Sequence, residues 1–233
     1  MGGIKMQTTL SKPPVKYSYG PYNKYNETEQ WVRLTEGCPN QCPWCYEPKE
    51  QKVFPMPEII RKTVKIMDMN LLCKPEALSI IQTLGSKSAK TYELICGIDY
   101  RFLTQDLANA LFQNRFKNIR LAWDGPYTLQ MKIYDAIKIL LKAGYKADSL
   151  MIFMICNHFV STFEQNCAKL DLCKVWNVKV HDAYYDNQLP PHVQPVAWKD
   201  EQLKQFRRMV RHHNQIVLFK IDPQVRKRLD GGQ

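Results

Sequence analysis

Three cysteines crowd into one short segment of the chain, residues 37–46, which reads GCPNQCPWCY. Three residues separate Cys38 from Cys42, and two separate Cys42 from Cys45. Thiolates at these spacings in a tight, Pro-rich loop can converge on one iron–sulfur centre. A cube of four irons has four corners, so three thiolates leave one iron open to chelate the amino and carboxylate groups of a methionine moiety. The motif therefore predicts that Cys38, Cys42 and Cys45 are metal ligands.

Zinc is the competing metal, because it also accepts three cysteines and one histidine. Its ligands usually come as two separated pairs, and no second close pair of cysteines follows at a finger-like spacing. The remaining cysteines are scattered through apolar segments: Cys73, Cys96, Cys156, Cys167 and Cys173. Packing in the core is their favoured role, although Cys96 or Cys156 could also reach a cavity. Such a distribution indicates a reducing compartment rather than a disulfide framework.

Alternating strand and helix patterns must position this loop. Apolar, β-rich runs predict six strands at Trp31–Thr35, Val64–Met69, Tyr92–Cys96, Asn118–Trp123, Leu150–Cys156 and Lys179–Ala183. Helical spacing lies between them at Pro75–Leu84, Thr104–Arg115, Leu129–Ala143 and Thr162–Trp176, with Thr104 and Thr162 as N-caps and Gly144 as a C-terminal stop. The alternation predicts an α/β fold with a parallel sheet. A doubly wound sheet would show the same alternation of strands and helices as a barrel.

Polar side chains follow nearly every predicted strand. They are Asp68 and Asn70 after the second, Asp99 and Arg101 after the third, Asp124 after the fourth, Asn157 after the fifth and Tyr184 after the sixth. Active-site groups of a parallel barrel sit at these strand ends. Turns after strands prefer Asp and Asn for local reasons too, so each residue alone is equally well explained as a cap or an ion-pair partner. Their recurrence over five ends favours a shared site.

The cysteine segment resembles the radical S-adenosylmethionine (SAM) superfamily, whose hallmark is three cysteines at this spacing with an aromatic residue before the third. Trp44 occupies the aromatic position, which in the family packs beside the adenine. The resemblance covers about residues 31–183 and implies a partial (β/α)6 TIM-like barrel of parallel strands. It further implies a [4Fe–4S] cluster that reductively cleaves SAM to methionine and a 5′-deoxyadenosyl radical, which abstracts hydrogen from a substrate. An electron donor such as flavodoxin or ferredoxin is the implied partner.

The resemblance also suggests roles for the strand-end residues. The family commonly carries Gly-Gly-Glu after its second strand, whereas this chain has Asp68-Met69-Asn70, so we expect Asp68 and Asn70 to receive the SAM amino group. Asp124 and Asn157 fit the positions that hold the ribose hydroxyls or the adenine edge.

Asp99, Arg101 and Tyr184 are the candidate catalytic residues. Asp99 and Arg101 either pair with each other, or Arg101 clamps the SAM carboxylate or a substrate anion, because a guanidinium binds a carboxylate through two parallel hydrogen bonds.

We expect an irregular N-terminal arm at residues 1–30, a core domain at 31–183 and a basic C-terminal extension at 184–233, with a helix near Asp200–His213 over the barrel mouth or edge.

The formal charge is +11, from 33 Lys and Arg against 22 Asp and Glu. A basic surface attracts polyanions. The leading hypothesis is hydrogen abstraction from a nucleobase in DNA or RNA, or from another anionic substrate. The alternatives are a small-molecule isomerase or cyclase, a glycyl-radical activase, and a structural or electron-transfer iron–sulfur protein.

The sequence has no apolar run of about 18 residues and no apolar N-terminal leader. These features predict a cytoplasmic protein without a membrane partner. They leave the oligomeric state open.

Overall fold

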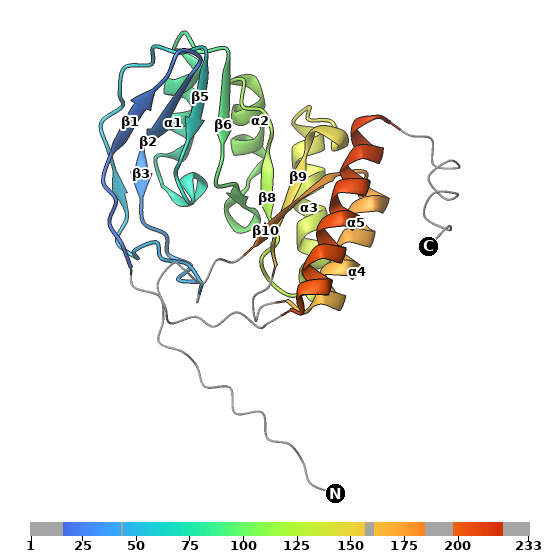
Figure 1. The fold of residues 1–233 in the computed structure, drawn as a ribbon. Helices are drawn as coiled ribbons and strands as arrows, with labels where there is room; N and C mark the ends of the chain where they lie inside the picture. Colours follow the sequence, from blue (N-terminus) through green and yellow to red (C-terminus); the bar gives the residue numbers. More distant parts are fainter. Residues whose placement is uncertain (1–15, 43, 157–160, 185–197, 221–233) are drawn as a thin grey trace, which may run out of the picture.

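A computed structural model describes residues 16–42, 44–156, 161–184 and 198–220 (Figure 1). Strands and helices alternate along the chain. The strands are β1 (Tyr22–Tyr25), β2 (Glu29–Arg33), β3 (Thr35–Glu36), β4 (Lys52–Val53), β5 (Thr63–Ile66), β6 (Thr91–Leu94), β7 (Ile98–Asp99), β8 (Arg120–Ala122), β9 (Met151–Cys156) and β10 (Lys179–Tyr184). The helices are α1 (Ala77–Gly85), α2 (Gln105–Gln113), α3 (Gln130–Lys142), α4 (Phe163–Trp176) and α5 (Asp200–Leu218).

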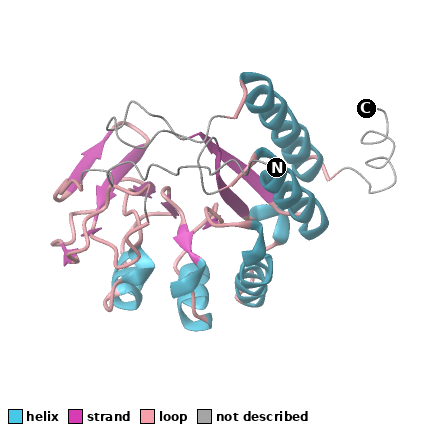
Figure 2. Ribbon diagram, turned by 90° about the horizontal axis from the view of Figure 1, so that it is seen from below, coloured by secondary structure: helices cyan, strands magenta, loops and turns pink. Residues whose placement is uncertain are grey.

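The strands form two main sheets. One has the order β1-β2-β5-β6 and the other β10-β9-β8-β7, and every pairing is parallel except that of β1 with β2. An isolated bridge joins Tyr92 of β6 to Phe116, in the segment that precedes β8. Figure 2 shows the strands in an open curve with helices along its outer side. The parallel α/β fold is thus confirmed.

The partial (β/α)6 barrel that the resemblance implied is not confirmed, because the hydrogen bonds divide the parallel strands between two sheets. The predicted strand Tyr92–Cys96 stops at Leu94, because the chain turns at Gly97, whose amide bonds to the Leu94 carbonyl at 3.1 Å. Gly97 has φ +89°, a left-handed conformation that glycine adopts without steric cost. The two-residue strand β7, which the sequence pattern missed, then resumes pairing with β8.

Side-chain periodicity explains the remaining elements. In β9 every second residue is buried, which places Ile152, Met154 and Cys156 in the core. Helix α3 buries Ile133, Ile137 and Leu140 on one face. The predicted caps are confirmed at α2 and α4: the hydroxyls of Thr104 and Thr162 accept backbone N–H bonds from the first turn of each helix. Gly144, at φ +112°, follows the end of α3 as expected.

The prediction of an irregular arm up to residue 30 is wrong for its last part. Strand β1 pairs antiparallel with β2, and the Asn26 side chain closes the turn between them by accepting the Thr28 and Glu29 amides at 2.8 Å. β1 is an edge strand whose side chains are largely exposed. Backbone pairing and polar surface contacts, such as the hydrogen bond from the Gln30 side chain to Asn23 at 2.8 Å, hold it in place. Its sequence therefore shows no apolar alternation to reveal it.

Helix α5 covers the other edge. The amide and carbonyl of Val180 in β10 bond to the Asn214 side chain at 2.8 and 2.7 Å, and the His213 ring bonds to the Val178 carbonyl at 2.7 Å. These contacts satisfy backbone groups that an open sheet edge would leave unpaired. The basic C-terminal helix is therefore part of the core packing, through Phe206 and Val210. Among the described residues, no helix combines the length and apolar character needed to cross a bilayer.

Candidate active site

The cysteine loop follows β3 and is anchored on both sides. Gly37 has φ +86°, and a side chain at this position would overlap the Glu50 carbonyl, so only glycine fits. The buried ammonium of Lys74 donates hydrogen bonds to the carbonyls of Glu36 and Gly37. The Glu47 carboxylate accepts the Gly37 amide at 2.6 Å. These contacts fix the direction in which the loop leaves the strand.

The segment before β1 holds the far end of the loop. Lys16 donates to the Cys45 carbonyl at 2.6 Å. The Glu36 carboxylate accepts hydrogen bonds from the Ser18 hydroxyl at 2.7 Å and the Tyr19 amide at 2.5 Å. Residues far apart in the sequence thus enclose the cysteines.

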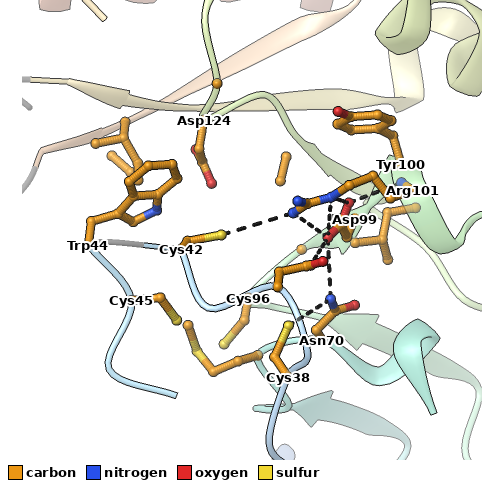
Figure 3. A pocket seen from close by; sticks show the side chains of 18 of the residues that line it. Cys38, Cys42, Trp44, Cys45, Asn70, Cys96, Asp99, Tyr100, Arg101 and Asp124 are labelled. Atoms are coloured by element: carbon orange, nitrogen blue, oxygen red, sulfur yellow. Dashed lines mark hydrogen bonds and ion pairs between the residues drawn. The ribbon is translucent and has the colours of Figure 1, made fainter. Parts of the chain in front are cut away.

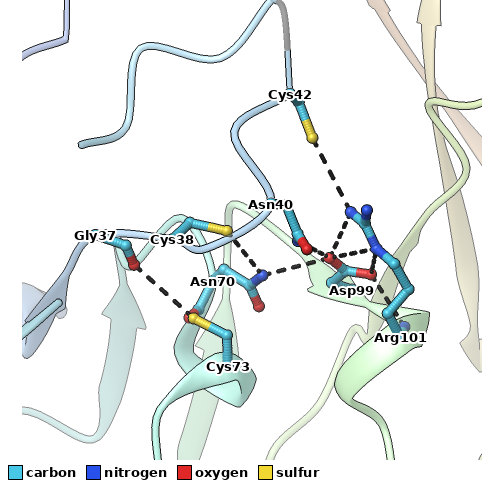
Figure 4. Close-up of polar contacts among 8 residues, drawn as sticks. All are labelled: Gly37, Cys38, Asn40, Cys42, Asn70, Cys73, Asp99 and Arg101. Atoms are coloured by element: carbon cyan, nitrogen blue, oxygen red, sulfur yellow. Dashed lines mark hydrogen bonds and ion pairs between the residues drawn. The ribbon is translucent and has the colours of Figure 1, made fainter. Parts of the chain in front are cut away.

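Each of the three cysteine sulfurs accepts an N–H hydrogen bond, as Figures 3 and 4 show in part. The Asn70 amide donates to Cys38 at 3.4 Å, the Glu47 backbone donates to Cys45 at 3.4 Å, and an Arg101 guanidinium nitrogen lies 4.0 Å from the Cys42 sulfur. Such donors stabilise the negative charge of a thiolate and tune the reduction potential of a cluster it binds.

The three thiols differ in acidity. A hydrogen bond from the neighbouring Cys73 thiol is the largest cause that lowers the pKa of Cys38 to about 6, with help from Asn70. Burial raises the pKa of Cys42 and raises that of Cys45 to about 11. The surroundings of Cys38 therefore favour its thiolate form, whereas Cys42 and Cys45 require a bound cation to lose their protons.

Asp99 joins the cysteine loop to the strand ends (Figure 4). Its carboxylate accepts the Asn40 amide at 2.5 Å and the Asn70 amide at 3.4 Å. It also forms an ion pair with Arg101, with Nη2 at 2.7 Å and Nε at 2.8 Å from its two oxygens. Of the two alternatives for these residues, the structure therefore shows the mutual pair.

A cavity of about 490 Å³ opens beside the loop. Figure 3 shows side chains from the loop and from several strand ends directed toward it. Nine of the residues singled out from the sequence line it: Cys38, Cys42, Trp44, Cys45, Asn70, Asp99, Arg101, Asp124 and Tyr184. The carboxyl ends of both sheets thus meet at one site, as parallel strands require.

Asp68 lies elsewhere. Its oxygens accept the Leu34 amide at 2.8 Å and the Thr35 hydroxyl at 2.7 Å, it is 1% exposed, and it does not line the cavity. Burial raises the pKa of Asp68 to about 6. The carboxyl ties β5 to the segment entering the cysteine loop. Asn157 lies outside the described residues.

Within the described part of the chain, the Asn70 side chain has an unpaired hydrogen-bond acceptor. It is 6% exposed, its Nδ2 donates to Cys38 and Asp99, and its Oδ1 has no partner among the described residues. An unpaired buried acceptor costs about 1–3 kcal/mol. A ligand that donates an N–H into the cavity would remove this cost.

Several residues of the site escaped the sequence pattern. Asn40 and Cys73 contact predicted residues directly, and Met69 and Tyr46 line the cavity. Cys96 also lines the cavity, as the sequence had allowed. The position of Asn40 inside the cysteine motif was a usable signal. The contact of Cys73 with Cys38 spans unrelated parts of the sequence and had none.

The chemistry of the donor set, three thiols, suits an iron–sulfur cluster. In the described part of the chain, no three His, Cys, Asp or Glu side chains gather closely enough for one metal ion. A [4Fe–4S] cube takes each thiolate on a different iron, so its ligands stand apart around a space. Three sulfurs lining one cavity, each with an N–H donor, meet that requirement.

Comparisons with known proteins agree with this at the level of the fold. No family model matches the sequence, and no curated protein matches it. Two solved structures of the radical SAM methyltransferase TsrM from Kitasatospora setae share the fold, each with a TM-score of 0.52. In fold, the chain resembles a radical SAM enzyme.

The likeness is distant in sequence, at 9% and 10% identity over 66% and 68% of this chain. The chain spans only about a third of the length of TsrM, 36% and 35% in the two structures. One of them contains cobalamin and a [4Fe–4S] cluster, and the other contains tryptophan and a SAM analogue. A likeness at this level of identity shows the fold alone.

Proposed function

We propose that this chain is a radical SAM enzyme that binds a [4Fe–4S] cluster through Cys38, Cys42 and Cys45. The observation that carries the proposal is the gathering of three thiols, each with an N–H donor, around one cavity. The fold shared with a radical SAM methyltransferase supports it. When bound, the cluster supplies the electron that cleaves SAM to methionine and a 5′-deoxyadenosyl radical.

The residues around the cavity divide the work of binding SAM. The unpaired Oδ1 of Asn70 accepts a hydrogen bond from the SAM amino group. Trp44 offers its ring to the adenine, and Asp124 accepts hydrogen bonds from the ribose hydroxyls. Arg101, already bound to Asp99, keeps one guanidinium edge near Cys42. Asp68 takes no part, since Leu34 and Thr35 occupy its oxygens.

Apolar side chains complete the cavity. Ile98, Ala122, Leu129, Ile155 and Ala183 line it between the polar residues. They limit the entry of water, which protects a reactive radical from side reactions. Tyr184 also lines the cavity and is the proposed contact to the substrate.

The test is anaerobic reconstitution with iron and sulfide, followed by reduction in the presence of SAM. We expect about four irons and four sulfides per chain, for one [4Fe–4S] cluster, and release of 5′-deoxyadenosine that requires both SAM and reductant. Reactions lacking either component are the controls. A fully loaded cluster without SAM binding would favour the electron-transfer or structural iron–sulfur protein, and zinc uptake without iron would refute the proposal.

For the substrate, we propose a nucleobase within DNA or RNA. The support is a basic face on α5, formed by Lys204, Arg208 and Arg211, which are exposed and spaced three and four residues apart. Arg207 continues this face to the cavity, because its guanidinium lies 4.5 Å from the ring of Tyr184. The same charge would assist an acidic electron donor such as flavodoxin or ferredoxin.

Removing this basic face should weaken binding of RNA or DNA in a salt-dependent way. We expect the triple variant Lys204→Ala, Arg208→Ala, Arg211→Ala to lower the slope of log affinity against log salt by about 2–3, since each phosphate contact contributes about 0.9 for a duplex and 0.7 for a single strand. Gel retention across a salt series measures it. The matched control removes Lys132, Lys142 and Lys146, which are exposed at and after α3. Equal slopes for both variants would contradict the nucleic-acid proposal.

A further inference from the structure

A fully buried lysine lies beneath the cavity. Lys169 of α4 is 0% exposed, and its ammonium donates to the Trp123 carbonyl at 3.3 Å and lies 5.4 Å from the Trp123 ring centroid. Burying an ammonium costs several kcal/mol unless an opposite charge compensates it. A carbonyl and an aromatic face compensate only part of this cost, so the position needs an anion.

Asp124 is that anion. The titratable groups that act on Lys169 are Asp124 and the thiols of Cys156 and Cys173. Burial raises the pKa of both thiols above their usual range, which leaves them neutral and leaves Asp124 as the counter-charge. Asp124 follows Trp123 directly in the chain, so the strand end that receives the ammonium also carries the carboxyl.

The surroundings of Asp124 agree. Lys169 faces it from α4 and the Ile155 amide from β9, while Asp99 and Arg101 face it from the strand end next to it. Burial raises the pKa of Asp124 to about 6 and Lys169 opposes that rise; burial lowers the pKa of Lys169 to about 8. Between these two values both groups carry charge. Figure 3 shows the Asp124 carboxyl directed into the cavity, in the region between Trp44 and Arg101.

We propose that Lys169 is a positioning residue, which holds Asp124 as a charged carboxylate on the cavity side for the SAM ribose hydroxyls. The proposal rests on the proposed function, in which Asp124 contacts SAM. Lys169 itself does not line the cavity and touches no ligand. Two opposite charges in the interior are weak as a stabilising device, because apolar residues of similar volume often replace them at no cost. Supplying a charged acceptor at a ligand site is a use that apolar residues cannot match.

The first test concerns SAM affinity as a function of pH, measured by calorimetry on the reconstituted, unreduced protein. Removing the positive charge raises the pKa of Asp124, so Asp124 becomes protonated at a higher pH than in the native protein. SAM affinity should fall as the pH is lowered, and in Lys169→Met we expect this fall to begin about one pH unit higher than in the native protein. Near pH 6 the variant should therefore bind SAM up to about tenfold more weakly. Native affinity should return above pH 8. Lys169→Gln keeps a donor for the Trp123 carbonyl and should show the same shift.

Two comparisons isolate the charge. Asp124→Asn should bind SAM weakly with no inflection near pH 6, and Lys132→Met, an exposed lysine of α3, should match the native profile. An unchanged profile in both Lys169 variants would overturn the role of Lys169 while leaving the proposed function intact. Failure of the native protein itself to bind SAM would overturn the proposed function, and with it this role.

A second test examines the coupling of the two charges without SAM. Melting temperatures of Lys169→Met, Asp124→Asn and the double variant at pH 7 form a double-mutant cycle. Each single variant leaves one charged group without the opposite charge, so we expect the double variant to melt higher than the sum of the single losses allows. Additive losses would show that the two groups are not coupled, and would overturn the proposal.

Discussion

Replacing Cys42 by alanine is expected to abolish both cluster binding and SAM cleavage. Three thiolates hold three irons of a cube, and two cannot fix its orientation. We expect iron content to fall to a small fraction of the native value after reconstitution, and 5′-deoxyadenosine to fall at least about a thousandfold, which corresponds to about 4 kcal/mol. Iron and sulfide assays, with chromatography of the nucleoside, measure both.

The matched control for this variant is Cys167→Ala. Cys167 is a half-buried thiol of α4 that does not line the cavity, so the control should load iron and release 5′-deoxyadenosine at native levels. Release of 5′-deoxyadenosine by the Cys42 variant would refute the assignment of the cluster ligands. Equal losses in both variants would point to general damage by thiol removal.

Replacing Asp99 by alanine should produce the largest loss outside the cysteines. Asp99 accepts hydrogen bonds from Asn40 in the cysteine loop, from Asn70 and from Arg101. Without it, Asn40 no longer ties the loop to the strand end, and the Arg101 charge loses its partner. We expect the free energy of unfolding to fall by about 2 kcal/mol, since solvent screens the half-exposed Arg101. Urea unfolding of the cluster-free protein measures this loss.

The same variant should weaken SAM binding about tenfold or more, because both Asn70 and Arg101 lose their orientation. Asp99→Asn should fall between the native protein and the alanine variant, since it keeps one oxygen acceptor without the charge. Asp135→Ala, which removes an exposed carboxyl of α3, serves as the control. A native melting curve and native SAM affinity for Asp99→Ala would show that Asp99 does not organise the site.

Much of this site was predictable from local sequence. The spacing of the cysteines and the polar residues after apolar strands were enough to predict which side chains meet, because parallel strands present their carboxyl ends on one side. Asp68 is an exception to the rule that polar residues after the strands line the site. The alternation of burial in β5 continues past the strand, so Asp68 falls on the same buried face as Val64 and Ile66. That period was readable in the sequence.

Other features depend on contacts that no local pattern contains. Asn40 and Asp99 are 59 residues apart, and Lys169 and the Trp123 carbonyl are 46 apart. Lys169 shares a buried helix face with Asn166 and Cys173, but a helix of such mixed composition has no clear apolar stripe to expose it. The short strands β1 and β7 likewise owe their existence to backbone pairing with neighbours.

The anchors of the cysteine loop have a consequence for how a metal centre would be assembled. Lys16 holds one end of the loop and Asp99, through Asn40, holds its middle, so these two ties close only when the first sheet and β7 are in place. In small zinc modules the metal supplies the folding energy, and the chain without metal is unfolded. For this chain we expect the reverse order. The polypeptide should fold first and prepare the site, so that insertion of iron would be a later and separable step.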